Sequence, residues 1–257
     1  MIKLAAFDVD GTLRDRDDVP DSTIQALQLL KENGVTLALC TGRSEVEVAT
    51  LREQLSIDWT VTCNGSHIGY RGGTLLGNPF REDTLQEWLQ TAQKHQHSML
   101  LYGAKAFYLF GSDEPHFRQA QREIGFMEPA RIEDGQEIPE IYQCILFIGE
   151  EQEPYYIPEG RDTYYVHRWR GWAVDVNPGG VNKAIGLSKL LDHLGMKPEE
   201  AAAFGDGLND LELLESVGTG IAMGNGSDEL KARAKYVTKP MHENGIAYAV
   251  KEWLMTT

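Results

Sequence analysis

Short apolar runs alternate with longer amphipathic segments through the first part of the chain. Residues 2–7 are almost continuously apolar, which is typical of a strand buried on both faces of a parallel sheet. Similar runs predict strands at 35–40 and 59–63, and the apolar spacing between the runs predicts helices at about 22–33 and 44–55. This order of strand, helix, strand, helix and strand is the pattern of a doubly wound α/β fold.

The pattern changes near residue 80. The elements predicted from there to residue 178 are helices at 84–95 and 115–124 and strands at 99–102, 106–110, 142–148, 164–169 and 172–176. The last two strands form a hairpin. The stretch 150–162 contains Pro154 and Pro158, so it is expected to form a loop or a single helical turn.

The α/β alternation returns after residue 178. The elements predicted there are helices at 182–194, up to about 216, after 227 and at 244–254, and strands at 201–204, 220–223 and 236–238. We therefore predict an α/β protein with a doubly wound, Rossmann-like parallel-sheet core. The core consists of residues 1–80 and 179–257, and an α+β cap, residues 81–178, is inserted into it.

The net charge and the cysteine content limit which partners the protein can bind and in which cellular compartment it is expected. A formal net charge of -15 argues against binding to nucleic acid or an anionic membrane, because both need clustered lysine and arginine. Three cysteines without CxxC spacing indicate neither a disulfide framework nor a zinc site. No secretion leader is apparent, and no apolar run approaches the roughly 20 residues of a membrane span. We expect a soluble, cytoplasmic protein that acts on a small molecule.

Two carboxylates, Asp8 and Asp10, follow the first predicted strand. Ligands of open α/β sheets collect beyond the carboxyl ends of the strands, so Asp8 lies where a reaction centre is expected. If the strand stays extended through Asp10, side-chain alternation places both carboxylates on the same side. An acidic turn explains these two residues equally well when they are considered alone.

Polar groups also stand at two other strand ends and at one helix start. Thr41 follows the second strand, where its hydroxyl has an ordinary use in satisfying the turn. Lys183 lies in the first turn of a helix, against the helix dipole, and is therefore either a surface residue or a group held there for an anion. Asp206, Asn209 and Asp210 follow a short apolar strand; a turn explains one of them but not three.

The hairpin of the cap carries an aromatic and basic cluster, His167, Arg168 and Trp169. Alternation in a strand, with one set of side chains packed and the other solvated, accounts for most of these residues without a ligand. They remain candidates for contact with a substrate.

In order along the chain, the motifs are DVDGT at 8–12, TGR at 41–43, NG at 64–65, Lys183 and GDGLND at 205–210. Together they resemble the haloacid dehalogenase superfamily of phosphohydrolases, and in particular its Cof-type branch, which carries a large cap between the second and third motifs. The chain departs from that branch in the cap, where the proline-containing stretch 150–162 replaces the usual second long helix.

The resemblance implies a phosphatase that works through an aspartyl-phosphate. Asp8 is then the nucleophile, and Asp10 protonates the leaving group and afterwards activates water. The resemblance also implies a Mg²⁺ ion held by Asp8, the main-chain carbonyl of Asp10 and Asp206. Asp210, with Asn209, then orients the waters of the ion or Lys183.

The same resemblance assigns the remaining motif residues to the phosphoryl group and the substrate. Thr41 and Lys183 hold the transferring oxygens, and Arg43 and Asn64 either contact the substrate or brace the site. The expected substrates are small phosphorylated metabolites, with sugar phosphates, flavin mononucleotide and pyridoxal phosphate as the candidates.

Two alternatives stay open. A sugar phosphomutase similar to the phosphomannomutases would use the same chemistry and return the phosphoryl group to a sugar, although the compact GDGLND motif weighs against it. A non-catalytic regulator that binds phosphorylated metabolites would use the same fold, but it would need neither Asp8 nor Asp10.

Overall fold

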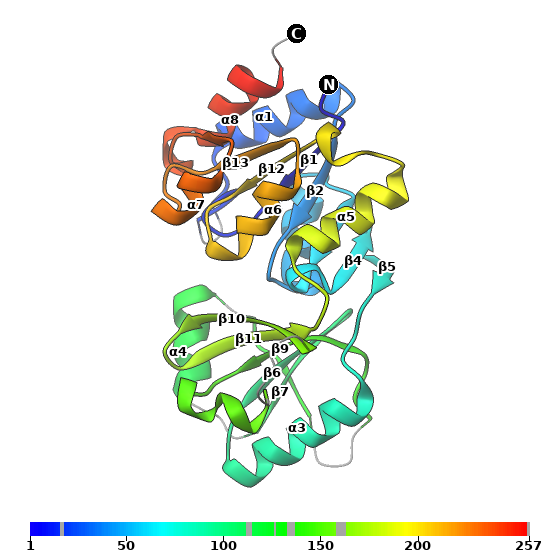
Figure 1. Cartoon of the computed structure of the whole chain (residues 1–257), viewed down its shortest axis with the longest axis vertical. Coiled ribbons are helices and arrows are strands. Elements are labelled where there is room, and N and C mark those ends of the chain that lie inside the picture. The colour runs from blue at the N-terminus through cyan, green and yellow to red at the C-terminus, as the bar shows by residue number, and fades with distance from the viewer. Residues whose placement is uncertain (16–17, 112–114, 126, 133–136, 158–162, 256–257) are drawn as a thin grey trace.

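Two sheets, one in each half of the molecule, organise the chain (Figure 1). The computed structural model describes residues 1–15, 18–111, 115–125, 127–132, 137–157 and 163–255. The half that carries both termini contains an eight-stranded sheet, and the other half contains a six-stranded sheet. The α/β class and the parallel-sheet core predicted from the sequence are confirmed.

The eight-stranded sheet has the order β14-β13-β12-β1-β2-β3-β4-β5. Its pairs are parallel from β14 to β3, and a hairpin adds the antiparallel strands β4 and β5. The strands are β1 (Leu4–Phe7), β2 (Thr36–Cys40), β3 (Trp59–Thr62), β4 (His67–Tyr70), β5 (Gly73–Gly77), β12 (Ala201–Gly205), β13 (Thr219–Ala222) and β14 (Tyr236–Val237).

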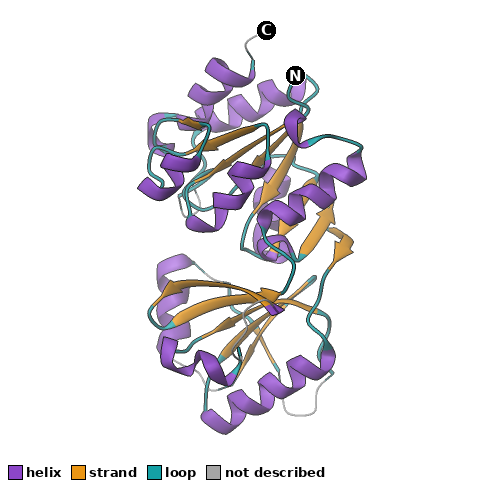
Figure 2. Cartoon of the chain, in the orientation of Figure 1, coloured by secondary structure: helices purple, strands orange, loops and turns teal. Residues whose placement is uncertain are grey.

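Helices cover both faces of this sheet (Figure 2). One face is packed by α1 (Asp21–Glu32), α2 (Glu45–Gln54) and α8 (Gly245–Ala249), and the other by α5 (Lys183–Leu194), α6 (Leu211–Ser216) and α7 (Asp228–Arg233). Strand β1 shows why the sequence lacks alternation. Ala5 and Phe7 pack on the face covered by α1, α2 and α8, and Leu4 and Ala6 pack on the face covered by α5, α6 and α7. A strand buried on both faces needs apolar side chains at every position.

The six-stranded sheet has the order β10-β11-β9-β6-β7-β8. Helix α3 (Glu82–His95) packs on one face, and α4 (Pro115–Ile124) packs on the face that turns toward the other half. The strands are β6 (Met99–Gly103), β7 (Phe107–Phe110), β8 (Ala130–Arg131), β9 (Ile141–Leu146), β10 (Tyr164–Arg170) and β11 (Ala173–Pro178). The chain enters this half after β5 and leaves it after β11, next to the boundaries predicted for the cap.

A few elements differ from the sequence prediction. Strand β8 was not predicted, because two residues are too short for a periodicity to appear. The expected stub after residue 149 is a short 3-10 helix, Glu150–Tyr155, and residues 158–162 of that stretch lie outside the described residues. The last helix changes to a π-helix over Val250–Leu254. Further 3-10 turns lie at Cys63–Gly65, Pro198–Glu200, Leu208–Asp210 and Met241–Glu243.

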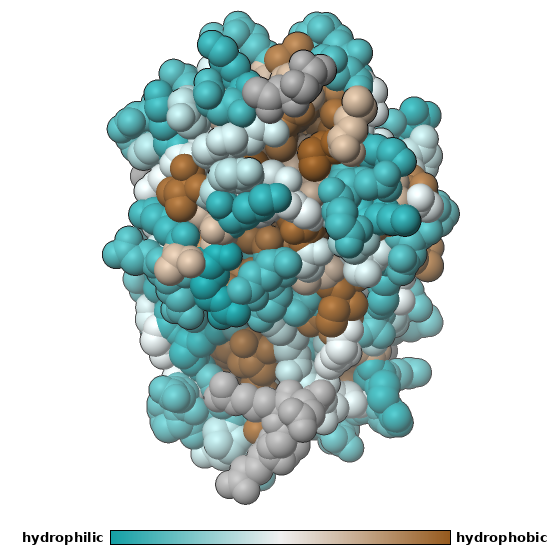
Figure 3. Space-filling view, turned by 45° about the horizontal axis from the view of Figure 1, so that its top comes forward, coloured by the Kyte–Doolittle hydropathy of each residue, from teal (hydrophilic) through white to brown (hydrophobic). Residues whose placement is uncertain are grey.

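The face shown in Figure 3 is largely hydrophilic, and its hydrophobic side chains stand in small separate groups. Among the described residues, no helix combines the length and the apolar character needed to cross a bilayer. The three cysteines, Cys40, Cys63 and Cys144, are buried free thiols.

Candidate active site

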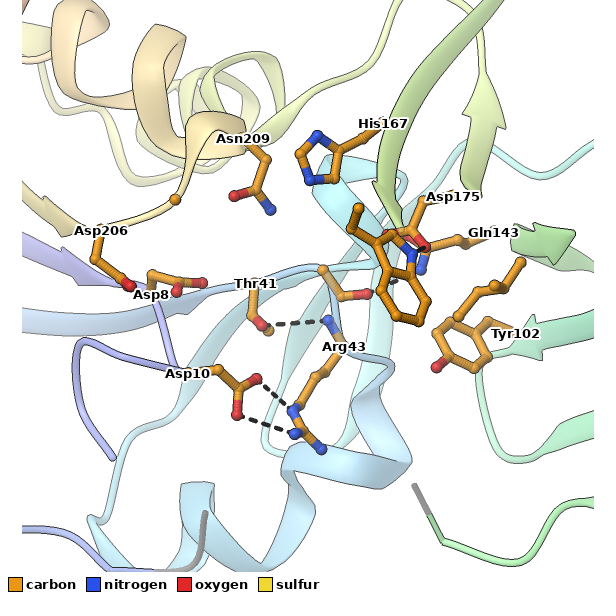
Figure 4. A pocket seen from close by; sticks show the side chains of 14 residues that line it. Asp8, Asp10, Thr41, Arg43, Tyr102, Gln143, His167, Asp175, Asp206 and Asn209 are labelled. Atoms are coloured by element: carbon orange, nitrogen blue, oxygen red, sulfur yellow. Dashed lines mark hydrogen bonds and ion pairs between the residues drawn. The ribbon is translucent and has the colours of Figure 1, made fainter. Parts of the chain in front are cut away.

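The residues predicted for chemistry meet at the carboxyl edge of the eight-stranded sheet. Strand β1 pairs in parallel with β2 and β12, with Phe7 opposite Leu39 and Phe204, so the residues after these strands emerge side by side. A pocket of about 250 Å³ lies between this edge and the six-stranded sheet (Figure 4). Its lining from the sheet edge consists of Asp8, Asp10, Thr41, Gly42, Arg43, Asp206, Gly207 and Asn209, and its lining from the cap consists of Tyr102, Gln143, Ile145, His167, Trp169 and Asp175.

Lys183 is the buried cation of the site. Its side chain is 1% exposed, and its Nζ donates to Oδ1 of Asp8 at 2.7 Å and to Oδ1 of Asp210 at 2.6 Å. Burial disfavours the charged amine, but the two carboxylates outweigh it and the pKa of Lys183 is raised. The lysine is therefore held for anions and is not an indifferent surface residue.

Burial raises the pKa of Asp8 well above its usual range, and the nearby Asp210 adds to the effect against the attraction of Lys183. Burial also raises the pKa of Asp206 to about 6, with a further contribution from Asp210. Three carboxyl groups with one lysine among them carry a net negative charge, so the site favours a positively charged ligand.

The carboxylates of Asp8, Asp206 and Asp210 each offer one oxygen, and these oxygens lie within 4.8 Å of one another. Oxygen donors with surplus negative charge are the ligand set that Mg²⁺ prefers, so these residues fit that ion. Both oxygens of Asp210 already accept hydrogen bonds. Its Oδ2 accepts from the main-chain N–H groups of Asp206 and Gly207 at 3.0 Å, and its Oδ1 accepts from Lys183. Asp8 and Asp206 point toward each other and face the pocket (Figure 4).

Gly11 makes room for Asp206. Its φ is +82°, and a Cβ at this position would lie 2.2 Å from Oδ2 of Asp206. The Asp206 carboxylate also accepts a hydrogen bond from the Thr12 hydroxyl at 2.9 Å. The glycine of the DVDGT motif thus has a steric reason as well as a conformational one.

Replacing Gly11 with alanine is expected to displace Asp206 and lower phosphate release by at least about 10-fold, and to destabilise the fold by roughly 1–3 kcal/mol. Gly34→Ala is the matched control, because Gly34 has a φ of +78° but nothing within 4 Å of the added Cβ. Urea unfolding and initial rates are measured for both variants. Both variants carry the backbone strain, but only Gly11→Ala also has the clash with Asp206, so the difference between the variants gives the effect of the clash. Equal activity of the two variants would contradict the steric role.

Asp10 faces the same pocket as Asp8, although the strand does not stay extended as far as Asp10. Strand β1 ends at Phe7, and the main-chain N–H groups of Leu13 and Arg14 donate to the carbonyl of Val9, so Asp10 lies within a turn. The condition of an extended strand through Asp10 is therefore not met, but both carboxyl groups still line the same pocket. The Asp10 carboxylate points to Arg43 (Figure 4).

Arg43 holds Asp10 through two bonds, from Nε at 2.5 Å and from Nη2 at 2.9 Å. The main-chain N–H of Arg43 also donates to Oγ1 of Thr41 at 3.2 Å, which orients that hydroxyl. Attraction by Asp10 and Glu47 outweighs burial and raises the pKa of Arg43. Of the two roles expected for Arg43, the observed contacts are those of a bracing residue.

Three buried amides join the cap to the sheet edge. Asn64, with φ of +49°, donates from Nδ2 to Oε1 of Gln143 at 3.0 Å, and its Oδ1 accepts from Asn209 at 3.2 Å. Gln143 donates to the carbonyl of Gly42 at 3.0 Å, and Asn177 donates to that of Cys63 at 2.8 Å. Asn64 is not part of the pocket lining, so its position is that of a bracing residue.

The three candidates in β10 separate as alternation requires. His167 and Trp169 line the pocket, whereas Arg168 points to the opposite face. There it donates to Glu153 at 2.7 Å and to the carbonyl of Ile148 at 3.1 Å. The expectation that Arg168 contacts the substrate is therefore corrected: its guanidinium ties β10 to the 3-10 helix Glu150–Tyr155.

Comparison with known proteins decides the family. The sequence model of the haloacid dehalogenase-like hydrolases matches residues 5–250. The chain belongs to this family. It is 36% identical over 253 residues to YkrA of Bacillus subtilis (strain 168), which is named as a phosphatase, with 97% of each chain covered. It is 32% identical over 266 residues to the HMP-PP phosphatase of Citrobacter koseri, covering 99% of this chain and 96% of that one.

A solved structure from Geobacillus kaustophilus HTA426 superposes with a TM-score of 0.90, at 35% identity and with 100% of both chains covered. The resemblance drawn from the motifs is thus confirmed, and the protein is a Cof-type haloacid dehalogenase-like hydrolase of phosphoric monoesters.

In this hydrolase, four residues of the pocket were missed by sequence reasoning: Tyr102, Gln143, Ile145 and Asp175. Two of them carry a signal in the sequence. Gln143 interrupts the buried strand β9, and Asp175 interrupts the buried stretch of β11. A polar side chain in a fully buried strand is the informative exception, and both of these strands end at the interface with the core.

Proposed function

We propose that this hydrolase releases phosphate from small phosphomonoesters in two steps. A carboxylate oxygen of Asp8 attacks phosphorus, the bond to the leaving oxygen breaks, and Asp10 gives that oxygen a proton. Water then attacks phosphorus, its proton returns to Asp10, and the bond between Asp8 and phosphorus breaks. The observation that carries the proposal is a buried carboxylate, Asp8, that faces the pocket with a lysine at 2.7 Å.

The approach of an anionic ester to an anionic nucleophile requires positive charge in the site. Asp8, the main-chain carbonyl of Asp10 and Asp206 would hold Mg²⁺, which when bound supplies a double positive charge against the phosphoryl oxygens. Lys183 supplies a further charge, and Asp210 keeps it in place. Asn209, which donates to Asn64, keeps its side chain at the pocket wall.

Thr41 and Arg43 act on either side of the transferring group. The Thr41 hydroxyl, oriented by the main chain of Arg43, is placed to donate to a phosphoryl oxygen. The guanidinium of Arg43 fixes the position of the Asp10 carboxyl group through its two hydrogen bonds. Asp10 must leave this pair to approach the leaving oxygen, and substrate that enters between the two side chains would separate them.

The cap, residues 81–178, is proposed to choose the leaving group, because it supplies six of the residues around the pocket. The proposed substrates are small phosphorylated metabolites, of which sugar phosphates, flavin mononucleotide and pyridoxal phosphate are candidates. One relative is named as an HMP-PP phosphatase, which supports small phosphorylated metabolites as the substrate class. The buried free thiols agree with the proposed cytoplasmic location.

Removal of divalent metal is expected to stop the reaction. Protein treated with EDTA and then dialysed should release p-nitrophenol from p-nitrophenyl phosphate at less than about 1% of the rate measured after Mg²⁺ is restored, because the charge of the carboxylates is then uncompensated. The absorbance of p-nitrophenolate measures both rates, and Ca²⁺ at the same concentration serves as a control for simple charge screening. A rate that is unchanged by chelation would contradict the metal requirement.

A further inference from the structure

Asp175 is a carboxyl group at the cap side of the pocket, away from the carboxylates that serve the phosphoryl group (Figure 4). It lies on β11 and is 8% exposed. Its Oδ1 accepts from Nε1 of Trp169 at 2.7 Å, and its Oδ2 accepts from Nδ2 of Asn64 at 3.4 Å. Both donors are neutral, so neither compensates a negative charge on Asp175.

No cation among the described residues forms an ion pair with Asp175. Arg43 is paired with Asp10, and Lys183 is paired with Asp8 and Asp210. His167 stands opposite Asp175 across the β10/β11 pair, but burial lowers its pKa, so it is neutral near pH 7. Burial, with a smaller contribution from Glu47, raises the pKa of Asp175 to about 7. A charged group that enters the pocket beside Asp175 thus meets a carboxyl group that still lacks a counterion.

The rest of this wall is neutral. Tyr102, Gln143, Ile145 and Trp169 line it with two aromatic rings, an amide and an aliphatic side chain. Aromatic faces attract cations, so Tyr102 acts in the same direction as Asp175, whereas the guanidinium of Arg170 already lies 5.6 Å from the ring centre of Trp169. A carboxylate or a second phosphate placed here would lose its water, find no positive partner on this wall and face a like charge.

We propose that Asp175 is the residue that selects the leaving group, and that this hydrolase prefers phosphomonoesters with a cationic nitrogen at the end that contacts the cap over those with an anionic group there. The inference rests on the proposed function of the same pocket. A neutral hydroxyl donor is expected to rank between the two, because it can donate to Asp175 but brings no charge.

A purely structural role for Asp175 is the competing explanation. In that role its carboxylate only fixes the indole of Trp169, and the charge of the leaving group has no effect on selectivity. The two explanations differ in the ratio of kcat/KM between substrates that share size and leaving-group acidity but differ in terminal charge.

Three phenyl phosphates make this comparison, with 2-aminoethyl, 2-hydroxyethyl or carboxymethyl at the para position. Their reacting ends are alike, and their far ends are cationic, neutral and anionic at pH 7. The expected order of kcat/KM is amine, hydroxyl, carboxylate, with about 100-fold between the first and the last. Equal values, or the reverse order, would overturn the inference and leave the proposed phosphatase activity standing. Hydrolysis of none of the three, or of p-nitrophenyl phosphate, would overturn the proposed function itself.

Asp175→Asn tests the residue directly, because asparagine keeps the size and an oxygen that can accept from Trp169. The ratio of kcat/KM between amine and carboxylate is expected to fall by at least about 10-fold. Asp58→Asn, at an exposed partner of Arg71, is the matched control and should leave the ratio unchanged. A proportional loss on all three substrates by Asp175→Asn would assign the residue to the structural role and overturn the inference.

Discussion

Replacing Asp8 with asparagine is expected to lower kcat for phosphate release by at least about 1,000-fold, because an amide does not act as the nucleophile in phosphoryl transfer. The change is nearly isosteric, and the asparagine oxygen can still accept from Lys183 where Asp8 accepts at 2.7 Å. Initial rates with p-nitrophenyl phosphate and saturating Mg²⁺ measure the loss. Full activity of Asp8→Asn would exclude Asp8 as the nucleophile.

The fold of Asp8→Asn should be at least as stable as that of the unchanged protein. The raised pKa of Asp8 shows that its ionised form is disfavoured in the folded state, chiefly by burial, so removing the charge relieves a cost. Urea unfolding at pH 7.5 measures this. Asp58→Asn serves again as the exposed control and should retain both activity and stability.

Replacing Lys183 with methionine is expected to lower both activity and stability. Methionine fills a similar volume but leaves the carboxylates of Asp8 and Asp210 without the cation that now lies at 2.7 and 2.6 Å. Removing one partner of a buried ion pair destabilises a protein by roughly 3–5 kcal/mol. The free energy of unfolding in urea gives the value, and phosphate release should fall by at least about 100-fold because a charge next to the phosphoryl group is lost.

The stability deficit of Lys183→Met should depend on pH with a definite sign. Without the lysine, the pKa of Asp8, already raised by burial, rises further above its value in the unfolded chain. A carboxyl group whose pKa is higher in the folded than in the unfolded state stabilises the fold fully at pH values below its unfolded-state pKa. This contribution is lost as the pH rises through its folded-state pKa. The difference from the unchanged protein should therefore be largest near pH 8 and shrink toward pH 5.

Lys3→Met is the control for that measurement, because Lys3 forms an ion pair with Glu200 at 2.6 Å but its side chain is 54% exposed. An exposed pair is worth about 0–1 kcal/mol, and no comparable pH dependence is expected. A deficit of Lys183→Met that stays constant or grows as the pH falls would show that the lysine does not compensate these carboxylates.

The residues at the sheet edge could be predicted because their positions depend only on where each strand ends and on the parallel pairing of the strands. An apolar run that ends in a polar residue marks the carboxyl end of a buried strand, and parallel pairing then brings such ends together, as it does for Asp8, Thr41 and Asp206. Asp10 also reaches the pocket, but through a turn that starts at Val9 and that the apolar pattern does not reveal.

The cap was predictable as a set of elements but not as a pocket wall. Alternation in β10 shows that His167 and Arg168 face opposite ways, but it does not tell which of the two faces meets the core. That choice depends on how the six-stranded sheet docks, and the docking is fixed by contacts distant in sequence such as Asn64 with Gln143. For Asp175, the polar residue within an apolar run is visible in the sequence, but the pocket that it faces is not.

The amides that join cap and core give the pocket a fixed depth. Gln143 binds the carbonyl next to Thr41, and Asn64 lies between Gln143 and Asn209, so directional bonds set the span from the phosphate end to the far wall. Apolar surfaces can slide past one another, whereas such bonds tolerate little displacement. The enzyme should therefore select its substrates by length. If a methylene is added or removed between the ester oxygen and the group that reaches the cap, the pocket can no longer bind both ends of the substrate at the same time.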